Sequence, residues 1–235
     1  EGRVSINGRI AVAGDRVFPG DKVCLDQNEV SWERLAVVEE STPVEEQFVY
    51  IKYWKPRGII CTTDRRIEGN IIDAIDHPTR IFPVGRLDKD SSGLILLTSD
   101  GRLPNTVLRS KERHKKEYKV QVNRAIKPSH IEMLRKGVLI TTVAQRDNKA
   151  KPLTAYTLPC QVEQLTDIIV RMTLTEGRNR QIRKMMDALG YKVVKLHRET
   201  IMGIGLEGLS APGKWASLNA AEMDAIKKSI NKASS

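Results

Sequence analysis

Alternating apolar and polar residues predict several β-strands along the chain. Three segments follow this pattern: FVYIKYW (48–54), YKVQV (118–122) and DIIVRMTLT (167–175). Successive side chains of a strand point to opposite faces, so we expect Tyr118, Val120 and Val122 to share one face. The unbroken apolar run LILLT (94–98) instead predicts a strand that is buried on both faces.

A different period predicts a helix that ends at Gly190. Its apolar residues recur at i, i+3, i+4 and i+7: Ile182, Met185, Met186 and Leu189. Glycine commonly follows the last turn of a helix. On this helix Arg180, Lys184 and Asp187 are expected on the face opposite the apolar residues. Arg183 is expected at the margin of the apolar stripe, where a guanidinium can be half buried.

Capping residues predict two more helices. Ser129 and Glu132 have the spacing of a capping box, ahead of a helix that stops at Gly137. Asn219 and Glu222 have the same spacing at the start of a C-terminal helix. The apolar stripe of that helix consists of Met223, Ile226 and Ile230. Since helices do not alternate regularly with strands, we expect an α+β fold with a mixed, largely antiparallel sheet.

The N-terminal segment differs from the rest of the chain. Short apolar-alternating stretches are separated by turn signals, which are Asn7-Gly8, Gly14-Asp15 and Pro19-Gly20. The alternating apolar residues are Val4, Ile6, Val23 and Leu25. The polar segment EESTPVEEQ follows and contains Pro43. We therefore expect a small β-module with its linker at 1–43 and a larger domain at 44–235.

Composition adds a strong positive charge to this picture. The 235 residues include 39 Lys and Arg against 29 Asp and Glu, a net charge of +10. This excess favours an anionic partner, and nucleic acid is the usual one for a basic protein of this size. A solvated, merely basic surface is the alternative. No apolar stretch approaches the ~20 residues of a membrane span, so we expect no membrane contact.

The cysteines and the first residue bear on where the protein works. Cys24, Cys61 and Cys160 are far apart and form no CxxC pair, which disfavours a disulfide framework and a zinc site. A reducing, cytoplasmic setting is therefore expected. The chain starts at Glu1 rather than Met, so we expect it to be a fragment of a longer protein.

The candidate chemistry lies in VGRLDKDSSGLILLTSDG (84–101), where Asp88 and Asp90 precede the buried strand. An aspartate in such a turn can project from the end of a sheet into a cleft, or it can cap the turn by accepting backbone N–H bonds. Tyr118 has two similar readings, as a core aromatic or as a pocket residue. Arg183 can belong to a solvated basic face or pair with a buried carboxylate and keep it ionised.

Together these segments resemble the ribosomal pseudouridine synthases, a family that joins an S4 RNA-binding module to a catalytic domain. The matching motifs are GRLDKDSSGLILLT, KPRG (55–58), KEYKV and EGRNRQIRKM, and GRVSING with the Gly20–Val23 segment resembles the back half of an S4 domain. The segment ETIMGIGLEGLSAPGKW resembles the subgroup that acts on large-subunit, 23S ribosomal RNA. The resemblance implies a pseudouridine synthase catalytic domain preceded by a partial S4-like module.

By this resemblance three residues form the catalytic set. Asp88 is the essential carboxylate, Tyr118 lies against the target base and Arg183 pairs with Asp88. Asp90 belongs to the motif but has no assigned chemistry. The implied substrate-binding residues are Arg86, Leu196 in KLHR, Lys55, Arg178 and Arg180.

The implied reaction converts a uridine of structured RNA to pseudouridine. It breaks the N1–C1′ bond, rotates the uracil and rejoins it through C5, and it needs no cofactor or metal. The target base must leave its stack, and two basic segments flanking the site offset that cost through phosphate contacts. Residues 109–119 carry six Lys or Arg against two Glu, and residues 176–198 carry seven against two acids. The expected partner is ribosomal RNA or transfer RNA, bound by a monomer.

Two alternatives remain at this point. A metal-dependent nuclease could hold Mg²⁺ with Asp88 and Asp90, although such sites usually recruit further acids. A non-catalytic RNA-binding protein would use the S4-like module alone, and replacing Asp88 would then leave its function intact.

Overall fold

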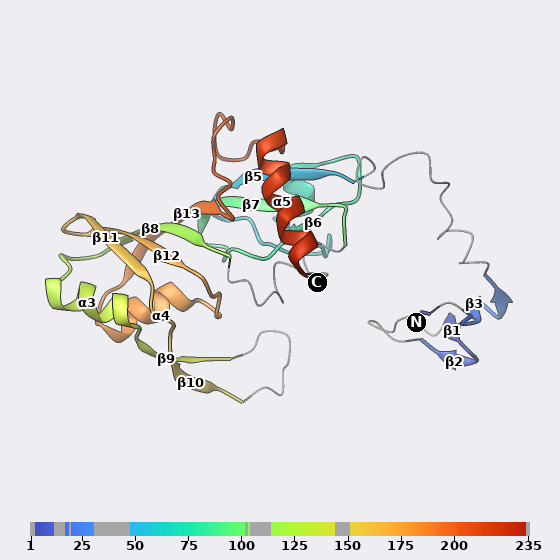
Figure 1. Cartoon of the computed structure of the whole chain (residues 1–235), viewed down its shortest axis with the longest axis horizontal. Helices are drawn as coiled ribbons and strands as arrows, with labels where there is room; N and C mark the ends of the chain where they lie inside the picture. The colour runs from blue at the N-terminus through green and yellow to red at the C-terminus, as the bar shows by residue number, and fades with distance from the viewer. Residues whose placement is uncertain are drawn as a thin grey trace. The chain divides into compact units, whose positions relative to one another are not determined.

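The computed structural model describes residues 3–11, 17–18, 20–30, 48–101, 103, 114–143 and 151–233. The chain divides into two compact units, Glu1–Gln47 and Phe48–Ser235. Figure 1 shows the elements of each unit along the chain. The predicted Gly14-Asp15 and Pro19 turn residues and Pro43 lie outside the described residues.

The first unit contains a four-stranded antiparallel sheet in the order β2-β1-β3-β4. Its strands are β1 (Val4–Ile6), β2 (Arg9–Ile10), β3 (Val23–Leu25) and β4 (Asn28–Glu29). The predicted Asn7-Gly8 turn joins β1 to β2, with φ angles of 50° and 80°. Asparagine and glycine tolerate this left-handed backbone better than other residues, which explains their place in the hairpin.

The second unit is built on a sheet of eight described strands. Their order is β11-β12-β8-β13-β7-β5-β14, with β6 paired to β7. The strands are β5 (Tyr50–Lys55), β6 (Phe82–Val84), β7 (Ser92–Thr98), β8 (Lys116–Val122), β11 (Gln161–Thr166), β12 (Ile169–Leu174), β13 (Val193–Ile201) and β14 (Trp215–Ser217). β13 and β7 run parallel, and the other pairings of these strands are antiparallel. The expected mixed, largely antiparallel sheet is confirmed.

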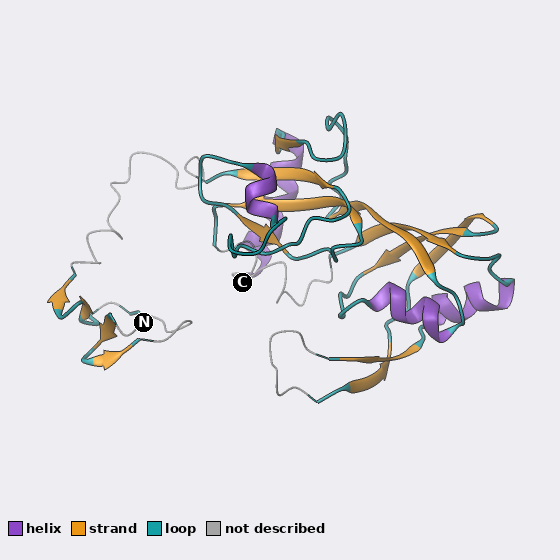
Figure 2. Ribbon diagram, turned by 180° about the vertical axis from the view of Figure 1, so that it is seen from behind, coloured by secondary structure: helices purple, strands orange, loops and turns teal. Residues whose placement is uncertain are grey.

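Helices cover the two halves of this sheet. α3 (Pro128–Lys136) and α4 (Gln181–Ala188) lie against the β8–β12 half, whereas α5 (Ala220–Ala233) lies at the β5–β7 half (Figures 1 and 2). α1 (Ile71–Ile75) packs on the face of β7 that carries Ile95 and Leu97. α5 packs on the opposite face, because its Ile226 shares a cluster with Leu94 and Leu96. The LILLT strand is therefore buried on both faces, as its sequence predicts.

A separate hairpin, β9 (Leu139–Thr142) with β10 (Leu153–Tyr156), extends from the α3 side of the unit (Figure 1). Ile140 of β9 is buried, and Lys184 of α4 donates from Nζ to the carbonyl of Thr141 at 2.7 Å. The hairpin is thus tied to the helix that also borders the pocket described below.

The helix starts give one confirmation and one correction. The amide of Asn219 donates to the Glu222 carboxylate at 2.9 Å, and the amide of Glu222 donates to Asn219 Oδ1 at 3.0 Å, which is the predicted capping box of α5. At α3 the prediction was wrong, because Lys127 is the N-cap and Pro128 the first helical residue. The first residue of a helix does not use its N–H in a helical hydrogen bond, so proline is favoured there. Pro128 therefore sets the start of α3 one residue before Ser129.

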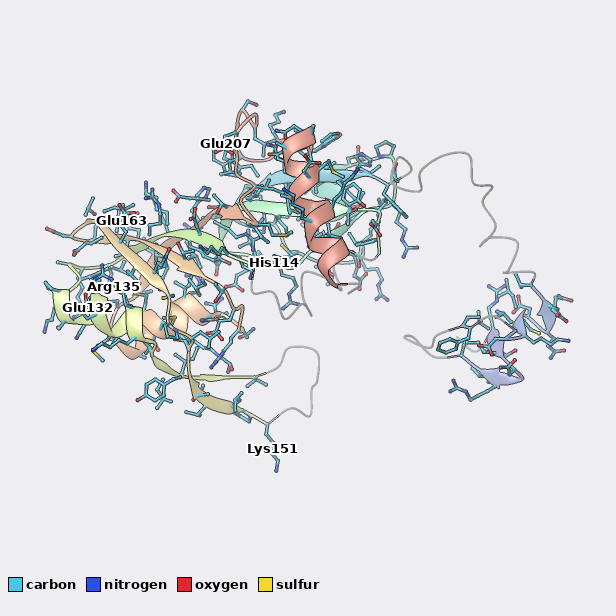
Figure 3. The ribbon with its side chains drawn as sticks, in the orientation of Figure 1. His114, Glu132, Arg135, Lys151, Glu163 and Glu207 are labelled. Carbon is cyan, nitrogen blue, oxygen red and sulfur yellow. The ribbon has the colours of Figure 1, made fainter. Side chains whose placement is uncertain are left out.

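Two further observations complete the fold. Glu132, which is not a capping residue in the structure, forms an ion pair with Arg135 on the next turn of α3 (Figure 3). The side chain of Ile230 lies outside the described side chains. No helix in the described ranges is long and apolar enough to cross a membrane.

Candidate active site

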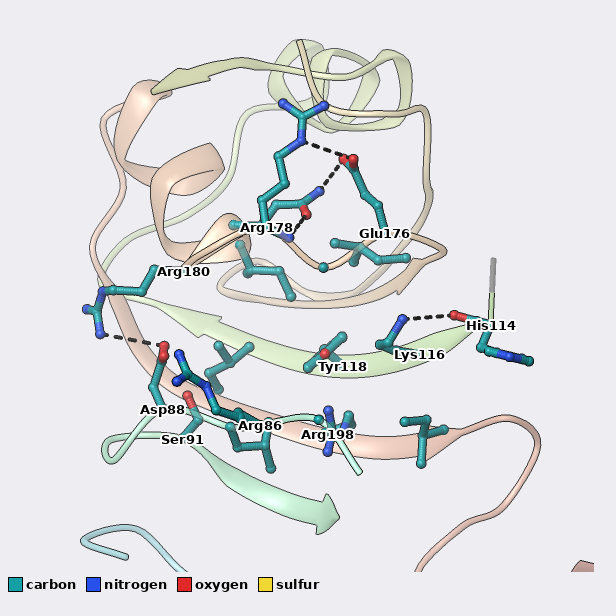
Figure 4. A pocket seen from close by; sticks show the side chains of 18 of the residues that line it. Arg86, Asp88, Ser91, His114, Lys116, Tyr118, Glu176, Arg178, Arg180 and Arg198 are labelled. Atoms are coloured by element: carbon teal, nitrogen blue, oxygen red, sulfur yellow. Dashed lines mark hydrogen bonds and ion pairs between the residues drawn. The ribbon is translucent and has the colours of Figure 1, made fainter. Parts of the chain in front are cut away.

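A cavity of about 380 Å³ opens where β8, β13, the start of α4 and the turn before β7 meet (Figure 4). Six of the predicted site residues line it: Arg86, Asp88, Tyr118, Arg178, Arg180 and Leu196. Arg183 contacts one of them, Asp88, from α4. Lys55 is not among the lining residues. The volume suits a single nucleoside-sized ligand within a larger bound molecule.

Asp88 lies in the turn between β6 and β7 and faces two guanidinium groups. Its Oδ2 lies 3.5 Å from Nη1 of Arg180 and 3.7 Å from Nε of Arg183. The turn is closed by the backbone rather than by the Asp88 side chain, since the Ser91 amide donates to the Asp88 carbonyl at 3.0 Å. The carboxylate is thus directed into the pocket, as the cleft reading of the sequence predicts. Two cations beside one carboxylate also disfavour a divalent metal there.

Arg183 is held in place by the same turn. Its Nη2 donates to the carbonyl of Asp90 at 3.3 Å and to Ser91 Oγ at 3.4 Å, and Nη1 donates to the carbonyl of Val193 at 3.3 Å. Its side chain is 14 % exposed. Burial lowers the pKa of Arg183, neighbouring Arg180 lowers it further, and Asp88 opposes both effects. The predicted marginal position on the helix is confirmed.

Arg180 departs from its predicted position. It is the N-cap of α4, with φ 50° and ψ 34°, and not a residue of the helix itself. Its side chain therefore leaves the solvent face that a continued helix would give it and reaches Asp88. The helix start is occupied by Gln181, whose Oε1 accepts from the Arg178 amide at 3.0 Å. The apolar repeat of this helix begins only at Ile182, so the sequence pattern itself indicates that Arg180 precedes the helix.

Tyr118 has both of the roles that its sequence position allowed, core aromatic and pocket residue. On β8 it lies opposite Met172 of β12 and Arg198 of β13. It packs against the apolar clusters of both halves of the sheet and also lines the cavity. Leu196 is buried on the same wall, next to Val120. An aromatic and an aliphatic side chain thus form an apolar surface between charged groups, which suits a planar ligand.

Lys55 is placed differently from the expected substrate contact. It is fully buried, and its Nζ donates to the carbonyl of Pro56 at 2.9 Å and to the carbonyl of Ser91 at 2.8 Å. Burial is the main cause that lowers the pKa of Lys55, and the charge of Asp88 partly offsets it. The residue therefore supports the turn that carries Asp88 from behind.

Arg178 lines the cavity, but its donors are used within the chain. Nε pairs with Glu176 at 3.1 Å, Nη2 donates to the carbonyl of Tyr156 at 2.8 Å, and Nη1 donates to that of Ala155 at 3.3 Å. It joins β10 to the loop before α4, so each nitrogen of its guanidinium makes a bond within the chain.

The sequence reasoning missed Arg198, which lines the cavity and is 2 % exposed. Period two along β13 places it on the same face as Leu196, and this was the available signal. Of the basic segment 109–119, residues 109–113 lie outside the described residues, whereas Lys116 borders the pocket together with His114. No cluster of three or more His, Cys, Asp or Glu that could hold a metal occurs within the described ranges.

Comparisons with known proteins agree with this geometry. Residues 49–188 match the family model described as RNA pseudouridylate synthase. The chain is 39 % identical over 235 residues to an Escherichia coli protein named dual-specificity RNA pseudouridine synthase RluF, covering 100 % of this chain and 73 % of that protein. It is 36 % identical over 214 residues to ribosomal large subunit pseudouridine synthase B of Bacillus subtilis, covering 89 % and 79 %.

Two further similarities extend this result. The chain is 30 % identical over 227 residues to ribosomal small subunit pseudouridine synthase A of Escherichia coli, covering 96 % and 92 %. A crystal structure titled pseudouridylate synthase superposes with a TM-score of 0.68 at 28 % identity, covering 96 % of this chain and 89 % of that one.

Proposed function

Because this chain belongs to the RNA pseudouridine synthase family, we propose that it converts a uridine of large-subunit ribosomal RNA to pseudouridine, with Asp88 as the acting carboxylate. The observation that carries the proposal is the pocket carboxylate with two guanidinium partners at 3.5 and 3.7 Å. The carboxylate lines the pocket beside these cations, where it can act as a nucleophile or as a base.

The reaction needs a fixed carboxylate and room for a base to turn. The N1–C1′ bond breaks and its electron pair stays with the uracil ring. The ring rotates, C5 bonds to C1′, the C5 proton is lost, and N1 ends protonated. No net oxidation or hydrolysis occurs, so the atoms balance without a co-reactant.

We assign the other pocket residues by the surfaces they present. Tyr118 stacks on the flipped uracil, and its hydroxyl handles the C5 proton. Leu196 closes the apolar side of the base site. Arg86 and Arg180 face the cavity with cationic groups and contact the RNA backbone around the target. Arg183 orients Asp88, and Lys55 holds the turn beneath it.

The broader assignments follow from the same family. We propose that residues 1–43 form a partial S4-like RNA-binding module with its linker, that residues 44–235 form the catalytic domain, and that a monomer acts in the cytoplasm, where bacterial ribosomal RNA is made. Identity is higher to the relative named for the large subunit, 36 %, than to the one named for the small subunit, 30 %, which supports 23S RNA as substrate.

The test of the proposal is Asp88→Asn, with Asp90→Asn as the matched control. Asp88→Asn should abolish pseudouridine formation in 23S RNA transcripts while RNA binding persists, because it removes the carboxylate and leaves the volume unchanged. Asp90→Asn should remain active, since Asp90 contacts Arg183 through its backbone carbonyl. Substantial activity of Asp88→Asn would refute the catalytic assignment and favour a non-catalytic RNA-binding protein.

The substrate is identified by mapping. Pseudouridines in ribosomal and transfer RNA should be compared between cells with and without the gene. Transfer RNA is included as a second class of structured RNA, because the Escherichia coli relatives are named dual-specificity enzymes. We expect a 23S position to lose its modification, whereas a change confined to 16S RNA would contradict the large-subunit assignment.

A further inference from the structure

Arg198 carries a buried donor that has no partner in the described structure. Its Nε donates to the carbonyl of Leu94 at 2.7 Å, whereas Nη2 is buried and finds no hydrogen-bond acceptor among the described residues. A buried group with a full charge and an unmade hydrogen bond is costly to keep. Such a group is retained where a ligand supplies the missing acceptor.

The position of Arg198 next to Tyr118 favours the base as that ligand. Arg198 on β13 lies directly opposite Tyr118 on β8, so their side chains leave the sheet on the same face, about 4.5–5.5 Å apart at Cβ. Figure 4 shows Arg198 beside Tyr118 in the cavity, with Asp88 farther away, next to Arg180. A uracil stacked on Tyr118 therefore has its ring edge within reach of the guanidinium.

The guanidinium is also fixed before any ligand arrives. A Cβ built on Gly93 of β7 would lie 2.2 Å from the carbonyl oxygen of Arg198, so the two backbones are in close contact. The bond from Nε to Leu94 then sets the plane of the guanidinium. A donor whose plane is fixed in advance is well suited to stabilise charge that develops during a reaction.

Building on the proposed function, we propose that Arg198 donates from Nη2 to a carbonyl oxygen of the target uracil and stabilises the negative charge on the ring. When the N1–C1′ bond breaks, its electron pair enters the ring and is shared with the carbonyl oxygens. The same contact holds the detached base while it turns. The charge develops whether Asp88 attacks the sugar or removes a proton from it.

Lys116 is the other cation at this end of the pocket and is a weaker candidate. Its Nζ already donates to the carbonyl of His114 at 3.1 Å. Burial lowers the pKa of Lys116, and the charge of Arg198 lowers it further. Of these two cations, Arg198 is the one with a buried donor that lacks an acceptor among the described residues.

The experiment replaces the acceptor atom and the donor separately. Single-turnover rates are measured on a short RNA carrying uridine, 2-thiouridine or 4-thiouridine at the mapped position, with enzyme saturating. Sulfur accepts hydrogen bonds weakly, so one of the thio-substrates should slow the wild-type enzyme. Arg198→Met should lower the rate on uridine about 10²- to 10³-fold, with RNA affinity within a few-fold of wild type.

The decisive result is the interaction between the two changes. In Arg198→Met and Arg198→Lys the thio penalty should largely disappear, because the hydrogen bond it reports is already lost or misplaced. Arg178→Met is the matched control: it removes a pocket arginine whose Nε, Nη1 and Nη2 each donate within the chain, to Glu176, Ala155 and Tyr156, so the penalty should persist. Arg198→Lys keeps the positive charge and serves if Arg198→Met does not fold.

Two outcomes would overturn the inference. An undiminished thio penalty in both Arg198 variants, or no penalty in the wild type, would remove the contact with the base. A uniform loss of affinity with a smaller salt slope would make Arg198 a phosphate ligand instead. In either case turnover of unmodified uridine by the wild type leaves the proposed function standing.

Discussion

Arg180 Nη1 lies 3.5 Å from Oδ2 of Asp88, slightly closer than Arg183 Nε at 3.7 Å, although only Arg183 is also bonded to the turn that carries the carboxylate. The two arginines differ in exposure, with 45 % for the Arg180 side chain and 14 % for that of Arg183. Charge pairs weaken as solvent reaches them. The buried partner should therefore matter more to catalysis and the exposed one more to RNA binding.

Arg183→Met should lower the single-turnover rate about 10- to 100-fold, the equivalent of ~1.4–2.7 kcal/mol, because it removes the buried cation whose Nε lies 3.7 Å from Asp88. Arg180→Met should change the rate less and reduce the salt slope of RNA binding by about one. Rates and binding isotherms at two salt concentrations measure both effects. Equal rate losses in the two variants would show that exposure does not separate their roles. Lysine at 183 should rescue poorly, because it lacks the forked donors.

Tyr118→Phe should slow the reaction about 10²-fold with near-normal RNA affinity. The ring and its packing remain, and only the hydroxyl proposed to handle the C5 proton is lost. Release of tritium from C5-labelled uridine measures that step directly. Tyr118→Leu is the control, which removes the ring as well and should weaken binding too. A Phe variant as fast as the parent would leave Tyr118 as a stacking residue alone.

Cys160 should resist alkylation in the native protein. Burial raises the pKa of its thiol to about 11, and Sγ donates to the carbonyl of Leu134 at 3.3 Å. At pH 8 the reactive thiolate is therefore scarce. Mass spectrometry after brief treatment with iodoacetamide should show Cys24 modified before Cys160 and Cys61, the latter of which is buried. Early labelling of Cys160 would contradict the described packing.

The same thiol predicts a loss of stability at alkaline pH. The folded chain holds the Cys160 proton more tightly than the unfolded chain, whose thiol has the ordinary pKa of 9.0. Since the native state then binds more protons, the contribution of this group to the free energy of unfolding falls as pH rises from about 9 to about 11. Cys160→Ala should make the alkaline decline in melting temperature shallower. An unchanged decline would place its origin elsewhere.

Gly93→Ala should destabilise the protein by more than ~1 kcal/mol and abolish most of its activity. The added Cβ would meet the backbone of Arg198, at 2.2 Å from its carbonyl oxygen and 2.5 Å from its nitrogen, and φ is +112°. Gly101→Ala is the control, because no atom lies within 4 Å of a Cβ there. Thermal melts and single-turnover rates of both variants check the prediction. A Gly93→Ala protein as stable as the control would mean that the strands can move apart freely.

Local patterns predicted the elements of the fold better than the partners of the site residues. The strands that contain Tyr118 and Leu94 and the helix that contains Met185 were predicted from local sequence. In each of them the apolar residues follow a pattern that strand or helix geometry explains. The hairpin of β9 and β10 was not predicted, since most of β10 is exposed and has no clear apolar period. The start of α3 was mispredicted because Pro128 outweighed the capping box.

The site residues show the corresponding limit. The pair of Asp88 with Arg183 could be inferred from a resemblance, but the supporting contact of Lys55 and the free donor of Arg198 arise only when distant strands meet. Lys55 reaches the carbonyl of Ser91, 36 residues along the chain, and Arg198 reaches that of Leu94, 104 residues away. No local pattern records which carbonyl a buried cation will find.

The parallel pairing of β7 with β13 has a consequence for how variants of this protein should be interpreted. In the described structure this pairing consists of Ser92 with His197 and Gly93 with Arg198. It joins the half of the sheet that carries Asp88 to the half that carries Tyr118, Arg180 and Arg183. A change that widens this seam would disable the enzyme while every reacting group stays chemically intact. Misalignment and loss of a group would look identical in an activity screen. Only the first would be repaired by a second-site mutation that draws the strands together again.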